Sequence, residues 1–374
     1  MNDVMGLLFA YSDSKRMGQL SVPRTTSSIP FGGNYRALDF MLSNMVNAGC
    51  RDVGVVLREG YQSLLDHLGS GRDWDLSRKN GGLVLLPPFG YNPTMENRGY
   101  DASVKGKMSA LINNLSYIRN TRKKYVILGE GRVILNIRLE PFIDEHIRSG
   151  ADITMVSAAP LGESTRGIYV TTDESSRVTD INTYHSSPGQ LESLGIYILE
   201  RTALLDLIDY GIVNDMSYFE RGVLRTLLPE LHIHCKSHHG FVAKLQTIEG
   251  YFNSSMELLD RNVRRDLFNP DNPIYTRVRD FVATYYGDES DVTNSLVADG
   301  CHIEGKVENS ILFRGVHIAP GAVVKNSIVM TNGKIGKNTF LNYIIADKLV
   351  TVTDDSMLVG STRFPVVINK GHTV

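Results

Sequence analysis

The chain has 374 residues, 42% of them hydrophobic and 21% charged, with a formal net charge of −2. This length predicts two domains with sizeable cores, and the near-neutral charge excludes bulk attraction to nucleic acid or an anionic membrane. The three cysteines form no C-x-x-C pair, which excludes a disulfide framework or a zinc site as the expected organisation. No uncharged run reaches the roughly 18 residues of a spanning helix, and no signal sequence is recognised, so the cytoplasm is the expected compartment.

The first elements alternate between strand and helix. The apolar run of residues 4–10 predicts a strand buried on both faces, and helical spacing over residues 40–48 predicts a helix. A second apolar run at residues 52–57 then predicts another strand. Strand, helix and strand in this order indicate a parallel sheet, whose ligands bind at the carboxyl ends of the strands.

Further elements of the same kind follow along the first 259 residues. The patterns predict helices at 61–68, 140–150 and 251–259 and strands at 81–88, 151–156 and 167–170. We therefore expect an α/β domain over residues 1–259, followed by a linker over residues 260–292 that contains two prolines.

The composition changes after residue 293. Apolar residues recur there at steps of six, as in Leu312, Ile318, Val324 and Met330, and glycines are interspersed. This period is typical of a left-handed parallel β-helix, which we expect over residues 293–374. Such coils commonly mediate subunit contacts, although plain packing would explain the pattern equally. An acyltransferase would need a catalytic histidine between coils, and the candidates His302 and His317 lack a distinctive context.

Residues 30–44 resemble a known family. They are PFGGNYRALDFMLSN, which matches P-F-G-G-K-Y-R-x-x-D-F-x-L-S-N of the sugar-nucleotide pyrophosphorylases, ADP-glucose pyrophosphorylase (glucose-1-phosphate adenylyltransferase) above all. Residues 309–316 resemble N-S-V-L-F-S-G-V of that family's C-terminal domain. The resemblance implies a nucleotidyltransferase domain of Rossmann-like type with a mostly parallel sheet, followed by a left-handed β-helix.

The nucleotide-binding segments of the family are altered here. Its phosphate loop, A-G-G-x-G-T-R-L, has lost all three glycines, and Ser12 and Ser14 stand at two of those positions. Glycine lets a loop approach phosphate without a Cβ in the way, so this loss weakens the cradle. The lysine of the family's R-A-K-P is Thr26, and the base loop retains Gly106. Tyr184 lies in the segment whose sugar-phosphate contacts are lost.

The resemblance also locates two metal-binding carboxylates. In ungapped matches, the first falls on Arg132 and the second on Lys244. Neither side chain can coordinate Mg²⁺, which nucleotidyl transfer needs to neutralise charge as pyrophosphate leaves. We therefore expect no catalytic residue, no metal site and no cofactor in this chain itself, with Mg²⁺ held by a catalytic partner.

Three hypotheses for the function remain open. The first is a non-catalytic or weakly catalytic regulatory subunit of the GlgD type, a pseudoenzyme in glycogen biosynthesis. It would assemble with a homologous catalytic subunit, as a heterotetramer, and would bind a small phosphate effector. The second is an active adenylyltransferase in which Glu130 or Asp180 is a replacement metal ligand. The third is a phosphate or sugar-phosphate sensor in which Arg16, Arg132 and Lys244, with Gly106 nearby, bind the anion.

Overall fold

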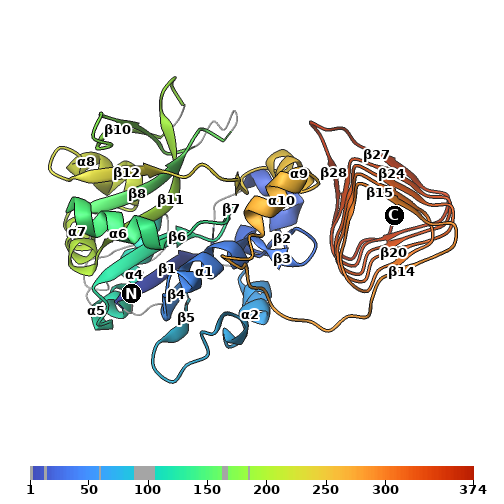
Figure 1. Cartoon of the computed structure of the whole chain (residues 1–374), viewed down its shortest axis with the longest axis horizontal. Helices are drawn as coiled ribbons and strands as arrows, with labels where there is room; N and C mark the ends of the chain where they lie inside the picture. Colours follow the sequence, from blue (N-terminus) through green and yellow to red (C-terminus); the bar gives the residue numbers. More distant parts are fainter. Residues whose placement is uncertain (1–2, 12–14, 59, 88–105, 162–166, 184–185) are drawn as a thin grey trace.

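The structure is a computed structural model that describes residues 3–11, 15–58, 60–87, 106–161, 167–183 and 186–374. An α/β domain forms one end of the molecule and a triangular coil of strands forms the other (Figure 1). The N-terminal strand lies in the middle of the α/β domain, whereas the C-terminus lies on the coil. The predicted fold class, an α/β nucleotidyltransferase-like domain followed by a left-handed parallel β-helix, is confirmed.

The α/β domain is built on a mixed sheet with the path β10-β9-β11-β6-β1-β4-β5. Off this path, β8 pairs with β11, and β12 pairs with β8. Its parallel part comprises β1 (Val4–Phe9), β4 (Asp52–Val56), β5 (Gly82–Leu86) and β6 (Tyr125–Glu130). The other strands are β8 (Ile153–Ala158), β9 (Tyr169–Thr172), β10 (Val178–Asn182), β11 (Leu191–Glu200) and β12 (Ile233–Ser237). β11 runs antiparallel to both β6 and β8, so the sheet departs from an all-parallel one at this strand.

Both faces of this sheet are covered, as the apolar runs predict. Met5, Leu7 and Phe9 of β1 belong to one buried core, and Val4 and Leu8 belong to another, because successive side chains of a strand point to opposite faces. The first core is closed by α4 (Lys107–Asn113), α5 (Leu115–Asn120) and α7 (Arg201–Val213). The second is closed by α1 (Ala37–Asn47), α2 (Gln62–Leu68) and α6 (Glu140–Ser149).

Shorter elements complete the domain. The helices are η1 (Lys15–Ser21), η2 (Thr26–Ser28), η3 (Arg72–Trp74), the π-helix η4 (Phe219–Leu224), α8 (Arg225–Leu227), α9 (Ile248–Glu257) and α10 (Arg261–Leu267). Two small antiparallel pairs are β2 (Pro30–Phe31) with β3 (Tyr35–Arg36) and β7 (Val133–Leu135) with β13 (Val242–Lys244).

The coil consists of three parallel sheets of five strands each. The first comprises β14 (Tyr285–Tyr286), β17 (His302–Ile303), β20 (His317–Ile318), β23 (Lys334–Ile335) and β26 (Thr351–Val352). The second comprises β15 (Asp291–Thr293), β18 (Lys306–Glu308), β21 (Val323–Lys325), β24 (Phe340–Asn342) and β27 (Met357–Val359). The third comprises β16 (Leu296–Val297), β19 (Ile311–Leu312), β22 (Ile328–Val329), β25 (Ile344–Ala346) and β28 (Val366–Ile368).

The six-residue steps follow the perimeter of this coil. Leu312, Ile318 and Val324 lie on successive sides of the triangle, in β19, β20 and β21, and all three side chains are fully buried. A step of six therefore moves the chain around one corner and returns an apolar side chain to the interior.

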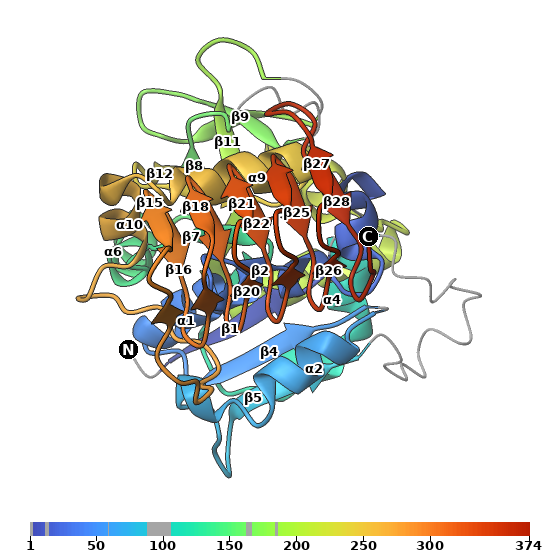
Figure 2. The same ribbon diagram turned by 90° about the vertical axis from the view of Figure 1, so that its right-hand side faces the viewer.

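The two domains are joined by a shared apolar core. Phe31 and Phe40 of the α/β domain belong to the same buried cluster as Ile311, Ile328 and Ile345 of the coil. In the turned view the coil lies directly in front of the α/β domain (Figure 2). The expected linker of residues 260–292 contains α10 and the first strands of the coil, because β14 already pairs with β17.

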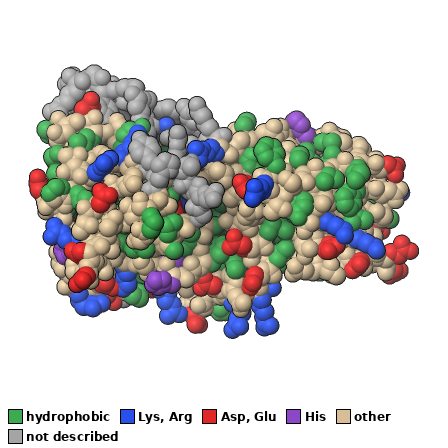
Figure 3. Space-filling view, turned by 90° about the horizontal axis from the view of Figure 1, so that it is seen from above, with side chains coloured by type: hydrophobic (Ala, Val, Ile, Leu, Met, Phe, Trp, Pro, Cys, Tyr) green, Lys and Arg blue, Asp and Glu red, His purple; other side chains and the backbone are tan. Residues whose placement is uncertain are grey.

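The surface agrees with the small net charge. Basic and acidic side chains are interspersed over the face seen from above (Figure 3). Within the described residues, no helix combines the length and the apolar character that crossing a membrane requires.

Candidate functional site

A cavity of about 390 Å³ opens beside the ends of β6 and β11 in the α/β domain. Its lining includes Glu130, Arg132, Tyr197, Glu220, Lys244 and Gln246. This is the edge at which ligands bind in open α/β sheets. The structure thus brings together Arg132 and Lys244, the two basic residues that the resemblance in sequence predicts at the family's metal-carboxylate positions.

Arg132 is paired with the carboxylate that ends β6. Its Nε donates to Glu130 Oε2 at 2.7 Å, and Lys107 Nζ lies 3.1 Å from the other oxygen of Glu130. Burial alone would raise the pKa of Glu130, but the positive charges of Arg132 and Lys107 hold it far below its ordinary value. Lys107 also forms an ion pair with Glu220, so one lysine at the start of α4 connects β6 to η4.

Lys244 is paired in the same manner on the other side of the cavity. Its Nζ donates to Glu192 Oε1 at 2.7 Å and to the backbone carbonyl of Ser193. The side chains are only 8% and 1% exposed for Lys244 and Glu192 respectively. Burial lowers the pKa of Lys244, and the carboxylate of Glu192 opposes this shift. The ion pair therefore joins β13 to β11.

A glycine makes room for the Glu130 carboxylate. Gly195 has a φ of 71°, and a Cβ at this position would lie 2.7 Å from Glu130 Oε1. The left-handed conformation and the close contact both favour glycine. Gly195 thus keeps the bulged middle of β11 close to the end of β6.

The donor set does not fit Mg²⁺. Hard divalent cations need several oxygen ligands, and the three described carboxylates of this region, Glu130, Glu192 and Glu220, each pair with a lysine or an arginine. Among the described residues, no group of three or more histidine, cysteine, aspartate or glutamate side chains is placed to hold a metal ion. Asp180, the other alternative ligand, is exposed on β10 and does not line the cavity.

The other residues predicted from the sequence lie apart. Ser12, Ser14 and Tyr184 are outside the described residues. Arg16 is exposed on η1 and is not among the lining residues, and Thr26 is buried at the start of η2.

Gly106 precedes α4 and is closely packed. A Cβ on Gly106 would lie 2.4 Å from the carbonyl oxygen of Ser217. The close backbone contact explains this glycine, and Gly106 holds the first residue of α4, Lys107, next to the cavity.

Lys107, Glu192 and Glu220 were missed by the sequence analysis. Each is an ordinary charged residue in a segment with no special spacing, and their partners lie 23 to 113 positions away, as for Glu220 with Tyr197 and Lys107. The only available signal was that the two substituted positions, Arg132 and Lys244, are both basic. Buried basic side chains require buried acidic partners.

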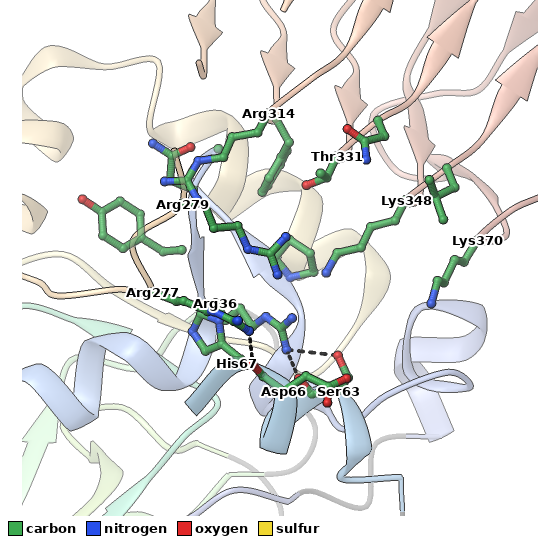
Figure 4. A pocket seen from close by; sticks show the side chains of 17 residues that line it. Arg36, Ser63, Asp66, His67, Arg277, Arg279, Arg314, Thr331, Lys348 and Lys370 are labelled. Carbon is green, nitrogen blue, oxygen red and sulfur yellow. Dashed lines mark hydrogen bonds between the residues drawn. The ribbon is translucent and has the colours of Figure 1, made fainter. Parts of the chain in front are cut away.

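A second cavity, of about 280 Å³, lies between the two domains. Six basic side chains line it. Arg36 comes from the α/β domain, Arg277 and Arg279 come from the segment between α10 and β14, and the coil contributes Arg314, Lys348 and Lys370. Figure 4 shows these side chains converging from the three parts of the chain. We call this cavity the interdomain pocket.

Basic charge in the interdomain pocket exceeds acidic charge. Arg36 donates to the Oγ of Ser63 at 3.0 Å and to its backbone carbonyl, both neutral acceptors. Burial lowers the pKa of Arg36 to about 10, and the nearby Asp39 opposes this shift. Asp39 in turn lies 2.6 Å from the imidazole of His67, which also lines the pocket. The guanidinium groups therefore retain capacity for an anion.

Comparison with known proteins agrees with this architecture. Residues 7–222 match the nucleotidyl transferase family, and residues 279–363 match the family described as GlmU-like, C-terminal hexapeptide. The chain is 33% identical to glycogen biosynthesis protein GlgD of Bacillus subtilis (strain 168), over 99% of this chain and 96% of that protein. It is 36% identical to GlgD of Geobacillus stearothermophilus, over 86% and 83%. It is 31% identical to glucose-1-phosphate adenylyltransferase of Fervidobacterium nodosum, over 97% and 87%.

The sheet, the cavity at its edge and the hexapeptide coil together define a protein of the nucleotidyltransferase class. More closely, the chain belongs to the ADP-glucose pyrophosphorylase (glucose-1-phosphate adenylyltransferase) family, in which it resembles the GlgD proteins over nearly its whole length. The resemblance inferred from residues 30–44 is thereby confirmed.

Proposed function

We propose that this chain is a regulatory subunit of ADP-glucose pyrophosphorylase, itself non-catalytic or weakly catalytic, that acts in glycogen biosynthesis. Two relatives that cover most of the chain are named glycogen biosynthesis protein GlgD. Its catalytic partner would be a homologous chain that converts ATP and glucose 1-phosphate to ADP-glucose and pyrophosphate. The hetero-oligomer, as a tetramer in the cytoplasm, is part of this proposal.

The observation that supports the proposal most is the pairing of Arg132 and Lys244. The resemblance in sequence predicts both cations at the positions of the family's metal carboxylates, and each is held by a carboxylate at 2.7 Å. A metal ion entering this cavity would have to separate buried ion pairs and would meet two fixed positive charges. We infer that this chain holds no Mg²⁺ and that the partner supplies it.

The interdomain pocket supports a regulatory role for the same chain. Its surplus of guanidinium and ammonium groups suits a small phosphate compound, because arginine binds phosphate oxygens through two parallel hydrogen bonds. The sensor hypothesis placed the anion at Arg16, Arg132 and Lys244, but the charges of Arg132 and Lys244 are already balanced. We therefore propose the interdomain pocket as the effector site.

The alternative is an active adenylyltransferase with relocated metal ligands. It would require Glu130 or Asp180 to bind Mg²⁺. Glu130 is engaged by Arg132 and Lys107, and Asp180 lies outside the cavity, so neither position favours this alternative.

The decisive experiment compares the chain alone with the chain co-expressed with a catalytic homologue. We expect negligible ADP-glucose formation by the purified chain with Mg²⁺, ATP and glucose 1-phosphate. Native mass measurement should give a mixed oligomer, whose activity responds to phosphate compounds differently from the catalytic homologue alone. Turnover by the isolated chain close to that of the homologue would contradict the proposal.

An interdomain variant serves as the control for regulation. Arg279→Gln removes one guanidinium from the pocket without touching Arg132 or Lys244. The mixed oligomer should still assemble, but its response to phosphate compounds should weaken. An unchanged response in this variant and in Lys370→Gln would remove the pocket from the proposal.

A further inference from the structure

Lys348 has an unusual setting within the interdomain pocket. It lies at a corner of the coil between β25 and β26 and is partly buried. Figure 4 shows its side chain extending from the coil toward the arginines on the opposite wall. Across the described part of the chain, no ion pair or side-chain hydrogen bond engages its Nζ.

The carboxylate next to Lys348 in the sequence forms its ion pair with another residue. Both oxygens of Asp347 accept hydrogen bonds from Arg24, at 2.8 and 2.6 Å. Burial first, and then the positive charges of Arg36 and Arg24, lower the pKa of Lys348 to about 7, although the charge of Asp347 opposes this shift. The lowered pKa makes this amine unprotonated more often at neutral pH than the amine of an exposed lysine, and an unprotonated amine is a nucleophile.

The surrounding arginines suit a reagent that bears a phosphoryl group. Arg36 and Arg279 line the same pocket and both act on Lys348 electrostatically. A phosphate bound by these guanidinium groups would keep its attached acyl carbon near the amine, which raises the local concentration of the reagent. Its negative charge also raises the pKa of Lys348, so the attack uses the fraction of the amine that stays unprotonated. The pocket thus combines a nucleophile with a holder for the leaving group.

We propose that Lys348 is a modification site, acylated on Nζ by small acyl phosphates whose phosphoryl group is bound by the pocket arginines. The unprotonated Nζ attacks the acyl carbon, and a C–N bond forms. The C–O bond to phosphate breaks, inorganic phosphate leaves with the electron pair, and the proton of the amine passes to solvent. The product is an uncharged amide, so the pocket loses the positive charge of the protonated lysine.

This inference rests on the effector pocket of the proposed function, because both require phosphate binding there. Acylation would lower the affinity of the pocket for phosphate compounds. The response of the chain to phosphate effectors would therefore depend on the concentration of acyl phosphates.

The test is incubation of the purified full chain with acetyl phosphate, followed by peptide mass measurement of each lysine over time. Lys306 and Lys334 are exposed lysines on the same coil and provide internal references. We expect Lys348 to be acetylated about tenfold faster or more than either, as for a lysine with an activated amine. Arg279→Gln and added sulfate should each slow the reaction at Lys348 but not at Lys306 or Lys334.

The outcomes separate the two proposals. If calorimetry shows that phosphate binds but Lys348 is acetylated no faster than the reference lysines, the modification proposal is overturned and the effector pocket stands. If phosphate does not bind, the pocket itself is refuted. Equal acceleration of Lys348 with an uncharged reagent, such as the N-hydroxysuccinimide ester of acetic acid, would overturn the role given to the arginines.

Discussion

Arg24 of the α/β domain and Asp347 of the coil form an ion pair across the domain boundary, in which one guanidinium nitrogen contacts both carboxylate oxygens. The guanidinium Nη2 lies 2.8 and 2.6 Å from the two carboxylate oxygens, and the side chains are only 2% and 1% exposed. Since each charge is buried, each depends on the other for its compensation. The pair therefore fixes the coil against the loop that precedes η2.

Breaking this pair should destabilise the protein strongly. Asp347→Asn leaves the Arg24 guanidinium buried without a counter-charge, and we expect a loss of about 3–5 kcal/mol in the free energy of unfolding. Chemical denaturation measures the loss. Glu308→Gln is the matched control, because it breaks an exposed coil pair with Lys325 and should cost about 1 kcal/mol or less. Equal effects of the two substitutions would refute the role of the buried pair.

The depressed pKa of Glu130 predicts a specific pH dependence. Its ordinary value is 4.5, and the folded state holds it far lower, so its stabilising contribution is complete above about 4.5 and is lost as the pH falls below that value. At neutral pH, Glu130→Gln should lower the free energy of unfolding by about 2 kcal/mol or more, because Arg132 and Lys107 lose their common partner.

Denaturation at several pH values checks this prediction. The difference between the original chain and Glu130→Gln should stay constant from neutrality to about pH 5 and then shrink toward pH 3. A difference that grows on acidification would contradict the assignment of Glu130 as an ionised partner.

The effect of the close contact between Gly195 and Glu130 can be measured separately from the effect of the left-handed backbone conformation of Gly195. Gly195→Ala places a Cβ against a carboxylate that two cations hold in position, so it should cost more than the roughly 1–2 kcal/mol of a left-handed alanine. Gly189 has a φ of 83° and open space around its Cβ position, and Gly189→Ala should show the conformational cost alone. Equal losses in thermal or chemical unfolding would show that the contact does not matter.

Sulfate binding to the interdomain pocket should tighten as the pH falls. The pKa of Lys348 is lowered to about 7 by burial and by Arg36, Arg24 and Arg279, with Asp347 opposing them. A bound anion favours the protonated lysine, so sulfate binding takes up a proton. For each unit by which bound sulfate raises the pKa of Lys348, the affinity should rise up to about tenfold between pH 8 and pH 6. Sulfate itself keeps its charge over this range, and calorimetry measures its affinity.

Lys348→Met is the control for this pH effect. The variant should bind sulfate more weakly at pH 6, and its sulfate affinity should no longer change near neutral pH. His67 also lines the pocket, but burial lowers its pKa despite the opposing charge of Asp39, so any remaining dependence should appear only at lower pH. If the sulfate affinity of Lys348→Met still changed near pH 7, the titrating group would be another residue.

The sequence alone determined the elements whose signal is local. The apolar run of β1 and the six-residue steps through Leu312 and Ile318 predicted a buried strand and a β-helix, because side-chain burial in both follows a fixed backbone period. Short motifs that match the family also predict the basic residues Arg132 and Lys244 at its metal positions. Each of these inferences needed only neighbouring residues.

The contacts of those basic residues depend on the folded arrangement of the chain. Lys244 meets Glu192 from 52 positions away, Lys107 meets Glu220 from 113, and Arg24 meets Asp347 from 323. No periodicity links such distant residues. A sequence also does not show whether the charge of a residue is compensated by solvent or by a buried partner. Folding removes water from these side chains, so their charges are compensated by whichever groups the sheet and the coil bring within hydrogen-bonding distance.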